Sequence, residues 1–165
     1  MEKTNQEKIE KNKDSWSLFL DTLTKIGCQY EFSKDGNEVG FTYEDNFDNN
    51  EKKEFIANFD YNEEEDYDRI WIGYLHDIYV NKNNEKEFSA FRDAINLASS
   101  LCDVSTYYIL NKTTGEVGAV SKTVLHYISH IPNFELFLKV VFQDCFIAQK
   151  IVEDEMEKFW KESEL

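Results

Sequence analysis

The sequence lacks most of the features by which an enzyme or a membrane protein is recognised. It has one proline and six glycines, with no glycine-rich phosphate loop, P-loop or GxSxG motif. No stretch reaches eighteen apolar residues, so we expect no membrane-spanning helix. The first fifteen residues are polar and contain no apolar core, so no signal peptide is predicted. The common motif-defined hydrolases and nucleotide enzymes are therefore excluded.

Cysteine and basic residues are also scarce. Cys28, Cys102 and Cys145 form an odd, widely spaced set without a CxxC pair. This pattern predicts three buried thiols in the reducing cytoplasm. Lys and Arg total 18 against 33 Asp and Glu, and the formal net charge is −15. Such a charge repels phosphates, so we expect no unaided binding to nucleic acid or anionic membranes, and it favours a basic protein partner.

The chain is long enough for one domain with a substantial core. It has 165 residues, of which 15% are aromatic. No internal repeat, proline-rich linker or change of composition divides it. We therefore predict a single α+β domain over residues 1–165, in which residues 1–14 form a helical extension that frays.

The strongest local pattern is a long helix from Pro132 to Trp160. Pro132 suits the first turn of a helix, where its missing N–H has no partner. One apolar stripe follows the helical period and predicts a core-facing side: Phe134, Leu138, Val141, Cys145, Ala148, Val152, Met156 and Phe159. A second apolar strip lies more than about 100° away on the helical wheel: Leu136, Val140, Ile147 and Ile151.

The second strip needs cover of its own, because long apolar patches on proteins in water usually mark contacts. A second copy of the chain could cover it, which predicts a homodimer through the C-terminal helix. The N-terminal helix or the edge of the sheet could instead fold over the strip within one chain. The sequence leaves both alternatives open.

Between the terminal helices the apolar period changes to two, which is typical of strands. Gly27 ends the first helix, and two alternating runs around Lys34–Asn37 predict a hairpin. Further strands are expected at 55–61 and 69–80, and the second of these looks covered on both faces, at least in part, through Trp71 and Leu75. Asn84 and Glu87 predict the start of a helix whose buried stripe is Phe88, Phe91, Ile95, Ala98 and Leu101.

A second hairpin, formed by residues 107–110 and 117–125, precedes the last helix. The order is α-β-β-β-β-α-β-β-α. Because the connections are hairpin-sized, this order predicts an antiparallel β-sheet with helices packed on one face and a long C-terminal helix.

Several segments resemble the YbjN-like family of bacterial sensory transduction regulators. The resemblance lies in the turn Lys34–Gly36, the strand Phe55–Ala57, the helical step Ala94–Asn96, and the strand–turn–strand from Tyr107–Leu110 to Gly115–Val117. It covers most of the chain from residue 16 onward. The family shares its architecture with type III secretion chaperones. The resemblance implies a non-enzymatic, protein-binding or regulatory role, and it supplies no catalytic residues.

The chain carries only weak candidates for chemistry. His126 and His130 have the spacing of metal ligands on a helix, but no HExxH motif is present and Pro132 argues against a helix there. His76 and Asp77 are neighbours in a strand, so their side chains should point to opposite faces. Cys102 falls near a helix C-terminus, where the helix dipole does not activate a thiol. We predict no catalytic residues, no cofactor and no metal site.

The most acidic segment runs from residue 44 to 68, with eleven Asp and Glu against two Lys. As a calcium loop starting at Asp60 it fails, because Glu65 and Trp71 replace the required glycine and glutamate. The segment is either a solvated loop or a surface for a basic partner, with Glu63, Glu64, Glu65 and Asp66 as candidate contacts.

Three functions fit these patterns. The first is a non-enzymatic protein-binding module of chaperone-like or regulatory type. The second is an acidic immunity-type inhibitor of a basic toxin, whose gene would then lie beside the toxin gene. The third is a metal-dependent enzyme using clustered carboxylates, which we rank last because the carboxylates lie mostly in one loop.

Overall fold

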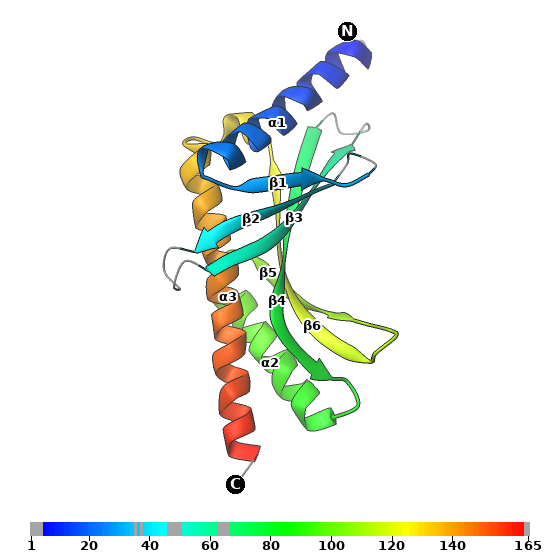
Figure 1. Cartoon of the computed structure of the whole chain (residues 1–165), viewed down its shortest axis with the longest axis vertical. Helices are drawn as coiled ribbons and strands as arrows, with labels where there is room; N and C mark the ends of the chain where they lie inside the picture. The colour runs from blue at the N-terminus through cyan, green and yellow to red at the C-terminus, as the bar shows by residue number, and fades with distance from the viewer. Residues whose placement is uncertain (1–4, 35, 37, 46–50, 63–66, 164–165) are drawn as a thin grey trace. The chain divides into compact units, whose positions relative to one another are not determined.

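The structure is a computed structural model that describes residues 5–34, 36, 38–45, 51–62 and 67–163. It is α+β, with a six-stranded antiparallel sheet in the order β1-β2-β3-β4-β6-β5, and the predicted fold class and element order are confirmed (Figure 1). The elements are α1 (Asn5–Lys25), β1 (Gln29–Phe32), β2 (Glu38–Asp45), β3 (Glu51–Asn62), β4 (Tyr67–Asn81), α2 (Glu85–Leu101), β5 (Ser105–Leu110), β6 (Glu116–His126), the 3-10 helix η1 (Ile128–His130) and α3 (Phe134–Ser163).

The chain divides into two compact units. Unit 1 contains residues 1–72 and 124–140, and unit 2 contains residues 73–123 and 141–165. The divisions fall inside β4, β6 and α3. None of the described helices combines the length and the apolarity that crossing a bilayer requires.

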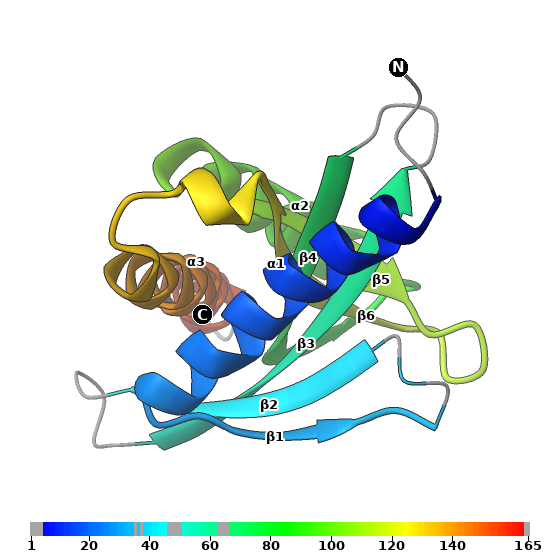
Figure 2. The same cartoon turned by 90° about the horizontal axis from the view of Figure 1, so that it is seen from above.

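In unit 1, α1 lies across β2 and β3 (Figure 2), and aromatic side chains join the helix to both strands. The ring of Phe19 meets Phe41 edge-on with centroids 6.2 Å apart, and Trp16 lies 5.7 Å from Phe59. Gly27, with φ +88°, ends the helix region, as the sequence predicted. The antiparallel pairing of β1 with β2 confirms the first hairpin. These contacts explain the helical and alternating patterns of the first third of the chain.

In unit 2, α2 and the second part of α3 pack on the same face of the sheet. The ring of Tyr74 in β4 meets Phe146 of α3 edge-on at 5.6 Å, and Tyr108 of β5 meets Phe88 of α2 at 5.4 Å. The predicted cap of α2 is confirmed, because the N–H of Glu87 donates to Asn84 Oδ1 at 3.3 Å. The opposite face of the sheet in this unit carries neither helix.

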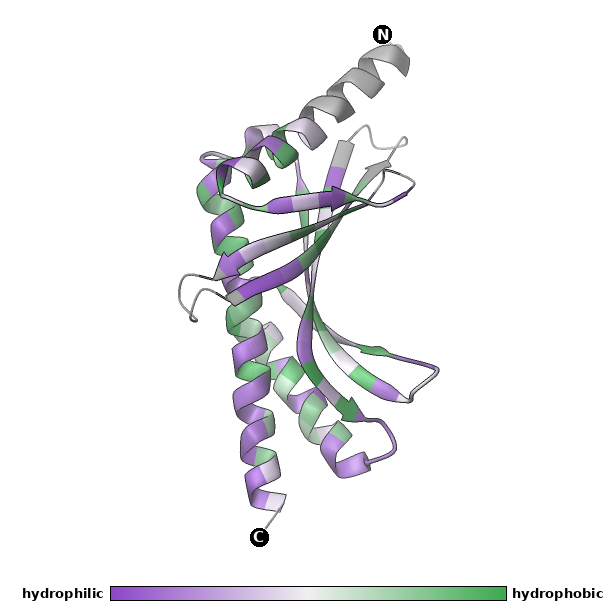
Figure 3. Ribbon diagram, viewed as in Figure 1, coloured by the Kyte–Doolittle hydropathy of each residue, from purple (hydrophilic) through white to green (hydrophobic). Residues whose placement is uncertain are grey.

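Helix α3 has the predicted core stripe but a different start. It begins at Phe134, so Pro132 lies in the turn before the helix instead of in its first turn. Asn133, with φ +48°, ends this turn, and its side-chain oxygen accepts from the N–H of Leu136 at 3.5 Å. All members of the core stripe are buried except Phe159, which is half-buried. In Figure 3 the last turns of α3 are mostly purple, whereas green recurs through its first half.

Four other predictions about burial were wrong. Phe88 of α2 is half-buried instead of buried. Leu101 is exposed, because α2 ends at this residue and Val104 in the next connection fills the core instead. Cys102 is half-buried, because it caps the helix end. Leu75 is exposed, because no helix of unit 2 covers its face of β4.

Candidate functional site

A buried chain of polar side chains joins the strands of unit 2. His76 Nε2 lies 2.8 Å from Ser121 Oγ, and Ser121 Oγ lies 3.1 Å from Thr106 Oγ1. His76 and Ser121 are both 0% exposed. Burial withdraws water from the imidazolium form and lowers the pKa of His76 to about 4. At neutral pH the network therefore contains a neutral imidazole.

The histidine–serine pair links strands inside the core and is not placed to react with a substrate. Its distance would suit a general base and a nucleophile, but substrate has no access to a fully buried pair. His76 Nδ1 has no hydrogen-bond partner among the described residues, so the carboxylate that would orient a catalytic imidazole is missing there. The pair instead ties β4 to β6 and Thr106 ties β6 to β5. The predicted separation of His76 from Asp77 is confirmed, since Asp77 is exposed.

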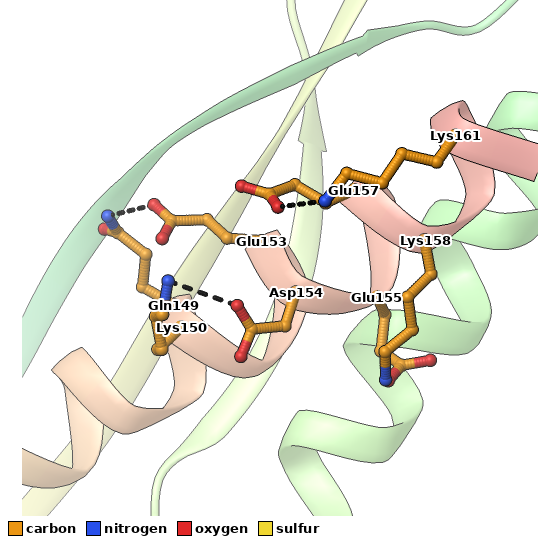
Figure 4. A network of polar contacts seen from close by, with 8 residues as sticks. All are labelled: Gln149, Lys150, Glu153, Asp154, Glu155, Glu157, Lys158 and Lys161. Carbon is orange, nitrogen blue, oxygen red and sulfur yellow. Dashed lines mark hydrogen bonds and ion pairs between the residues drawn. The ribbon is translucent and has the colours of Figure 1, made fainter. Parts of the chain in front are cut away.

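A second polar contact joins β4 to α3. The hydroxyl of Tyr74 donates to Gln149 Oε1. The Gln149 amide in turn donates to Glu153 Oε1 at 2.6 Å on the next turn of the helix (Figure 4). The buried polar atoms of Tyr74 and Gln149 thus have hydrogen-bond partners, which offset the free-energy cost of removing them from water. This contact fixes how the helix lies on the strand within unit 2.

The surroundings of the three thiols raise their pKa values and so disfavour the reactive thiolate form. Burial raises the pKa of Cys28 to about 12. The pKa of Cys145 is raised by burial first and then by the charge of Asp144. The pKa of Cys102 is raised by the same two causes and by Asp103. A thiol nucleophile needs the opposite shift, so none of the three is activated.

The histidines with metal-like spacing are not held in one helix. His126 ends β6, and His130 lies in η1, where it is 3.3 Å from Ser129 Oγ. Among the residues that the structure describes, no three His, Cys, Asp or Glu side chains converge as a metal site.

The face of the unit 2 sheet opposite the helices carries exposed apolar side chains. We call this the open sheet face and define it as Leu75, Tyr79, Tyr107, Ile109 and Val120. The first four are 45, 51, 41 and 43% exposed. Tyr107 pairs with Val120 and Ile109 with Gly118, while the ring of Tyr79 lies over Gly118 from the other side. The open sheet face is therefore one surface crossing β4, β6 and β5.

The residues predicted to bind a partner differ in how exposed they are. On α3, Leu136 and Val140 in unit 1 and Ile147 in unit 2 are exposed, whereas Ile151 is half-buried. Lys150 and Asp154 form an ion pair at 3.1 Å (Figure 4). In the sequence of α3, this pair falls on the same turns as Ile147 and Ile151. The acidic candidates Glu63, Glu64, Glu65 and Asp66 lie outside the described residues.

Sequence reasoning missed the polar network and the open sheet face. A signal for the network existed, because His76 and Ser121 occupy positions where the alternation of their strands calls for buried apolar residues. The open sheet face gave no such signal, because a covered strand and an uncovered apolar strand have the same pattern.

Comparison with known proteins adds no relative. No protein-family model matches the chain, and neither curated proteins nor solved structures give a significant match. The resemblance to the YbjN-like family stays a prediction.

Proposed function

We propose that this protein is a non-enzymatic protein-binding module, of chaperone-like or regulatory type, that holds a partner on its open sheet face. The observation that carries the proposal is the uncovered apolar surface across three strands of unit 2. Four of its five side chains are large, and two are tyrosines, which supply contact area with little loss of rotamer freedom. Contiguous apolar patches of this kind mark interaction sites on folded proteins.

The partner is a protein segment with an apolar centre and a basic rim. Apolar side chains on the partner would match Leu75, Tyr79 and Ile109. The basic rim follows from the net charge of −15, which attracts cationic surfaces and raises their rate of encounter.

Other features support the same proposal. The exposed residues of the α3 strip offer further apolar contact area, and a homodimer through that strip stays a prediction. All three cysteines are free, which fits a cytoplasmic location. The resemblance to YbjN-like regulators points to the same class of function.

The experiment compares three baits in the native cell extract. The wild-type chain is matched with Leu75→Ser/Tyr79→Ser, which removes two exposed side chains of the open sheet face. Leu101→Ser is the control, because Leu101 is also apolar and is even more exposed, at 66%, but lies at the end of α2.

A partner held on the open sheet face binds the wild type and the control, and is lost from the double variant. The purified partner should then bind more weakly as salt concentration rises, because its basic rim is screened. A partner that binds all three baits equally would remove the open sheet face from the proposal. If the affinity of the purified partner did not depend on salt concentration, the proposed basic rim of the partner would be ruled out.

A further inference from the structure

Strand β5 is the terminal strand of the sheet, and half of its backbone groups face away from β6. The pairing of Asn111 N–H with Glu116 O, at 2.8 Å, sets which residues bond to the neighbouring strand. Because bonded and non-bonded pairs alternate in an antiparallel ladder, Ile109 and Tyr107 bond to β6. Thr106, Tyr108 and Leu110 therefore turn their N–H and C=O groups to the free edge.

One of these three residues is already capped from within the chain. Ser99 Oγ of α2 donates to the carbonyl oxygen of Thr106 at 2.7 Å and accepts from its N–H at 2.9 Å. For Tyr108 and Leu110, no other described residue bonds to the outward backbone groups. The free edge is thus a window of two residues, bounded by Ser99 on one side and by the turn after Leu110 on the other.

The sequence of β5 lacks the residues that usually protect a sheet edge. Residues 105–110 read Ser-Thr-Tyr-Tyr-Ile-Leu, without a charge, a proline or a glycine. Tyr108, Ile109 and Leu110 are 47, 43 and 38% exposed. An apolar edge strand with unpaired backbone groups is a template for another strand.

We propose that β5 pairs antiparallel with β5 of a second copy of this chain, with Tyr108 of each copy opposite Leu110 of the other. In this register the outward N–H and C=O groups of Tyr108 in each copy bond to those of Leu110 in the other copy. No outward group of either residue is left without a hydrogen bond. The two-fold axis passes between the two Ile109 side chains, which meet as a close non-hydrogen-bonded pair. On the helix side, each Tyr108 lies beside Leu110 of the second copy, an aromatic–aliphatic cross-strand pair.

A second copy fits the window because the register is limited from both ends. Sliding the pairing toward Thr106 meets groups that Ser99 already bonds, and sliding it the other way runs into the turn. The strand brings no like charges into contact, although each chain carries a net charge of −15. Repulsion between whole chains should therefore weaken the pair at low salt and be screened at high salt.

The pairing also extends the surface described above. Ile109 belongs to the open sheet face, so the two-fold axis would join the open sheet faces of two copies. The pairing itself does not rest on the proposed function, and the purified chain alone tests it.

The decisive experiment measures mass by sedimentation for charge-swapped chains. For the wild type, mass should rise with protein concentration from 19.5 kDa toward that of a dimer, and more so at high salt. Ile109→Lys alone and Ile109→Glu alone should stay monomeric, because like charges meet at the axis. A mixture of the two should regain the dimer, because the axis then pairs opposite charges.

Matched controls separate this edge from other surfaces. Leu75→Lys places the same charge on the open sheet face but on β4, and should leave the dimer unchanged. Leu110→Pro removes an outward N–H without removing a bond to β6, and should abolish the dimer while the circular dichroism spectrum stays folded. In amide exchange, Tyr108 and Leu110 should become protected as concentration rises, whereas Thr106 is protected throughout.

Several outcomes would overturn the proposal. A wild type that stays at 19.5 kDa at all concentrations and salt levels would do so. So would a mixture of charge-swapped chains that fails to associate. Loss of the dimer in Val140→Lys/Ile147→Lys with retention in Ile109→Lys would assign the contact to the α3 strip. Protection of Tyr108 and Leu110 only on adding a basic extended peptide would assign the edge to another protein.

Discussion

The ring of Tyr79 lies directly over Gly118, with its Cε1 2.9 Å from the point where a β-carbon on residue 118 would sit. Real β-carbons essentially never approach a heavy atom so closely, so the glycine is what allows this edge of the ring to come so near β6. Ile109 pairs with Gly118 from the other side. The missing side chain thus shapes the centre of the open sheet face, and lets β4 contribute an aromatic ring above β6.

Gly118→Ala should lift Tyr79 off the sheet. The ring is half exposed and can rotate away, so we expect a modest destabilisation of about 1 kcal/mol relative to Gly40→Ala. Gly40 is the matched control, because it also lies in a strand and a β-carbon there meets nothing within 4 Å. Urea midpoints measure the difference in stability, and the ring resonances of Tyr79 report its movement. Equal midpoints with unmoved resonances would show that the sheet yields instead of the ring.

Val141→Asp and Ile147→Asp test the orientation of α3 in unit 2. Val141 is buried and Ile147 is 48% exposed, and both lie within the same helix. A charge buried without a partner should cost on the order of 3 kcal/mol or more at residue 141. The same change at the exposed position should cost less than about 1 kcal/mol. Urea unfolding curves that shift equally for both variants would contradict the assigned faces.

The thiols should react with iodoacetamide in a fixed order. All three thiols have raised pKa values, but Cys102 is only half-buried, whereas Cys28 and Cys145 are buried out of reach of the reagent. Alkylation at pH 8 should therefore modify Cys102 first, and Cys102→Ser should leave the folded protein almost unmodified until urea is added. Peptide mass spectrometry identifies the alkylated residue. Early modification of Cys145 would mean that α3 opens far more readily than its packing suggests.

The sequence was sufficient for the elements whose pattern is local. The first hairpin, the cap at Asn84 and the core stripe of α3 each follow from residues close together in the chain, and each was confirmed. The start of α3 was misplaced because Pro132 and Asn133 both suit a helix start. The structure uses Asn133, which takes up a left-handed conformation in the turn.

The candidate site could not be predicted in the same way, because it depends on which strands become neighbours. The polar network joins His76, Ser121 and Thr106, whose meeting requires the order β4-β6-β5. Likewise, Tyr79 and Ile109 share a surface only because both flank Gly118. The order of strands is set by the whole sheet, and no single stretch of sequence carries it.

The buried imidazole makes stability depend on pH in a defined window. The pKa of His76 is about 4 in the folded protein because burial disfavours the charged ring, and it is about 6.5 in an unfolded chain. Between these values the unfolded chain binds a proton that the folded chain does not. The free energy of unfolding should therefore be highest above pH 6.5. It should fall by about 3 kcal/mol as the pH drops from 6.5 to 4.

His76→Gln isolates this contribution, because glutamine can bond to Ser121 but does not titrate. The variant loses some stability at pH 7 through altered packing, so the measured quantity is the difference in slope between the two proteins. Urea unfolding of both between pH 7 and pH 4 should give a steeper fall for the wild type. Other groups that titrate in this range, such as Asp144 with its raised pKa, are common to both proteins and cancel. Parallel curves would mean that the imidazole is protonated inside the fold, which would require an anionic or hydrogen-bonding partner at Nδ1 that none of the described residues supplies.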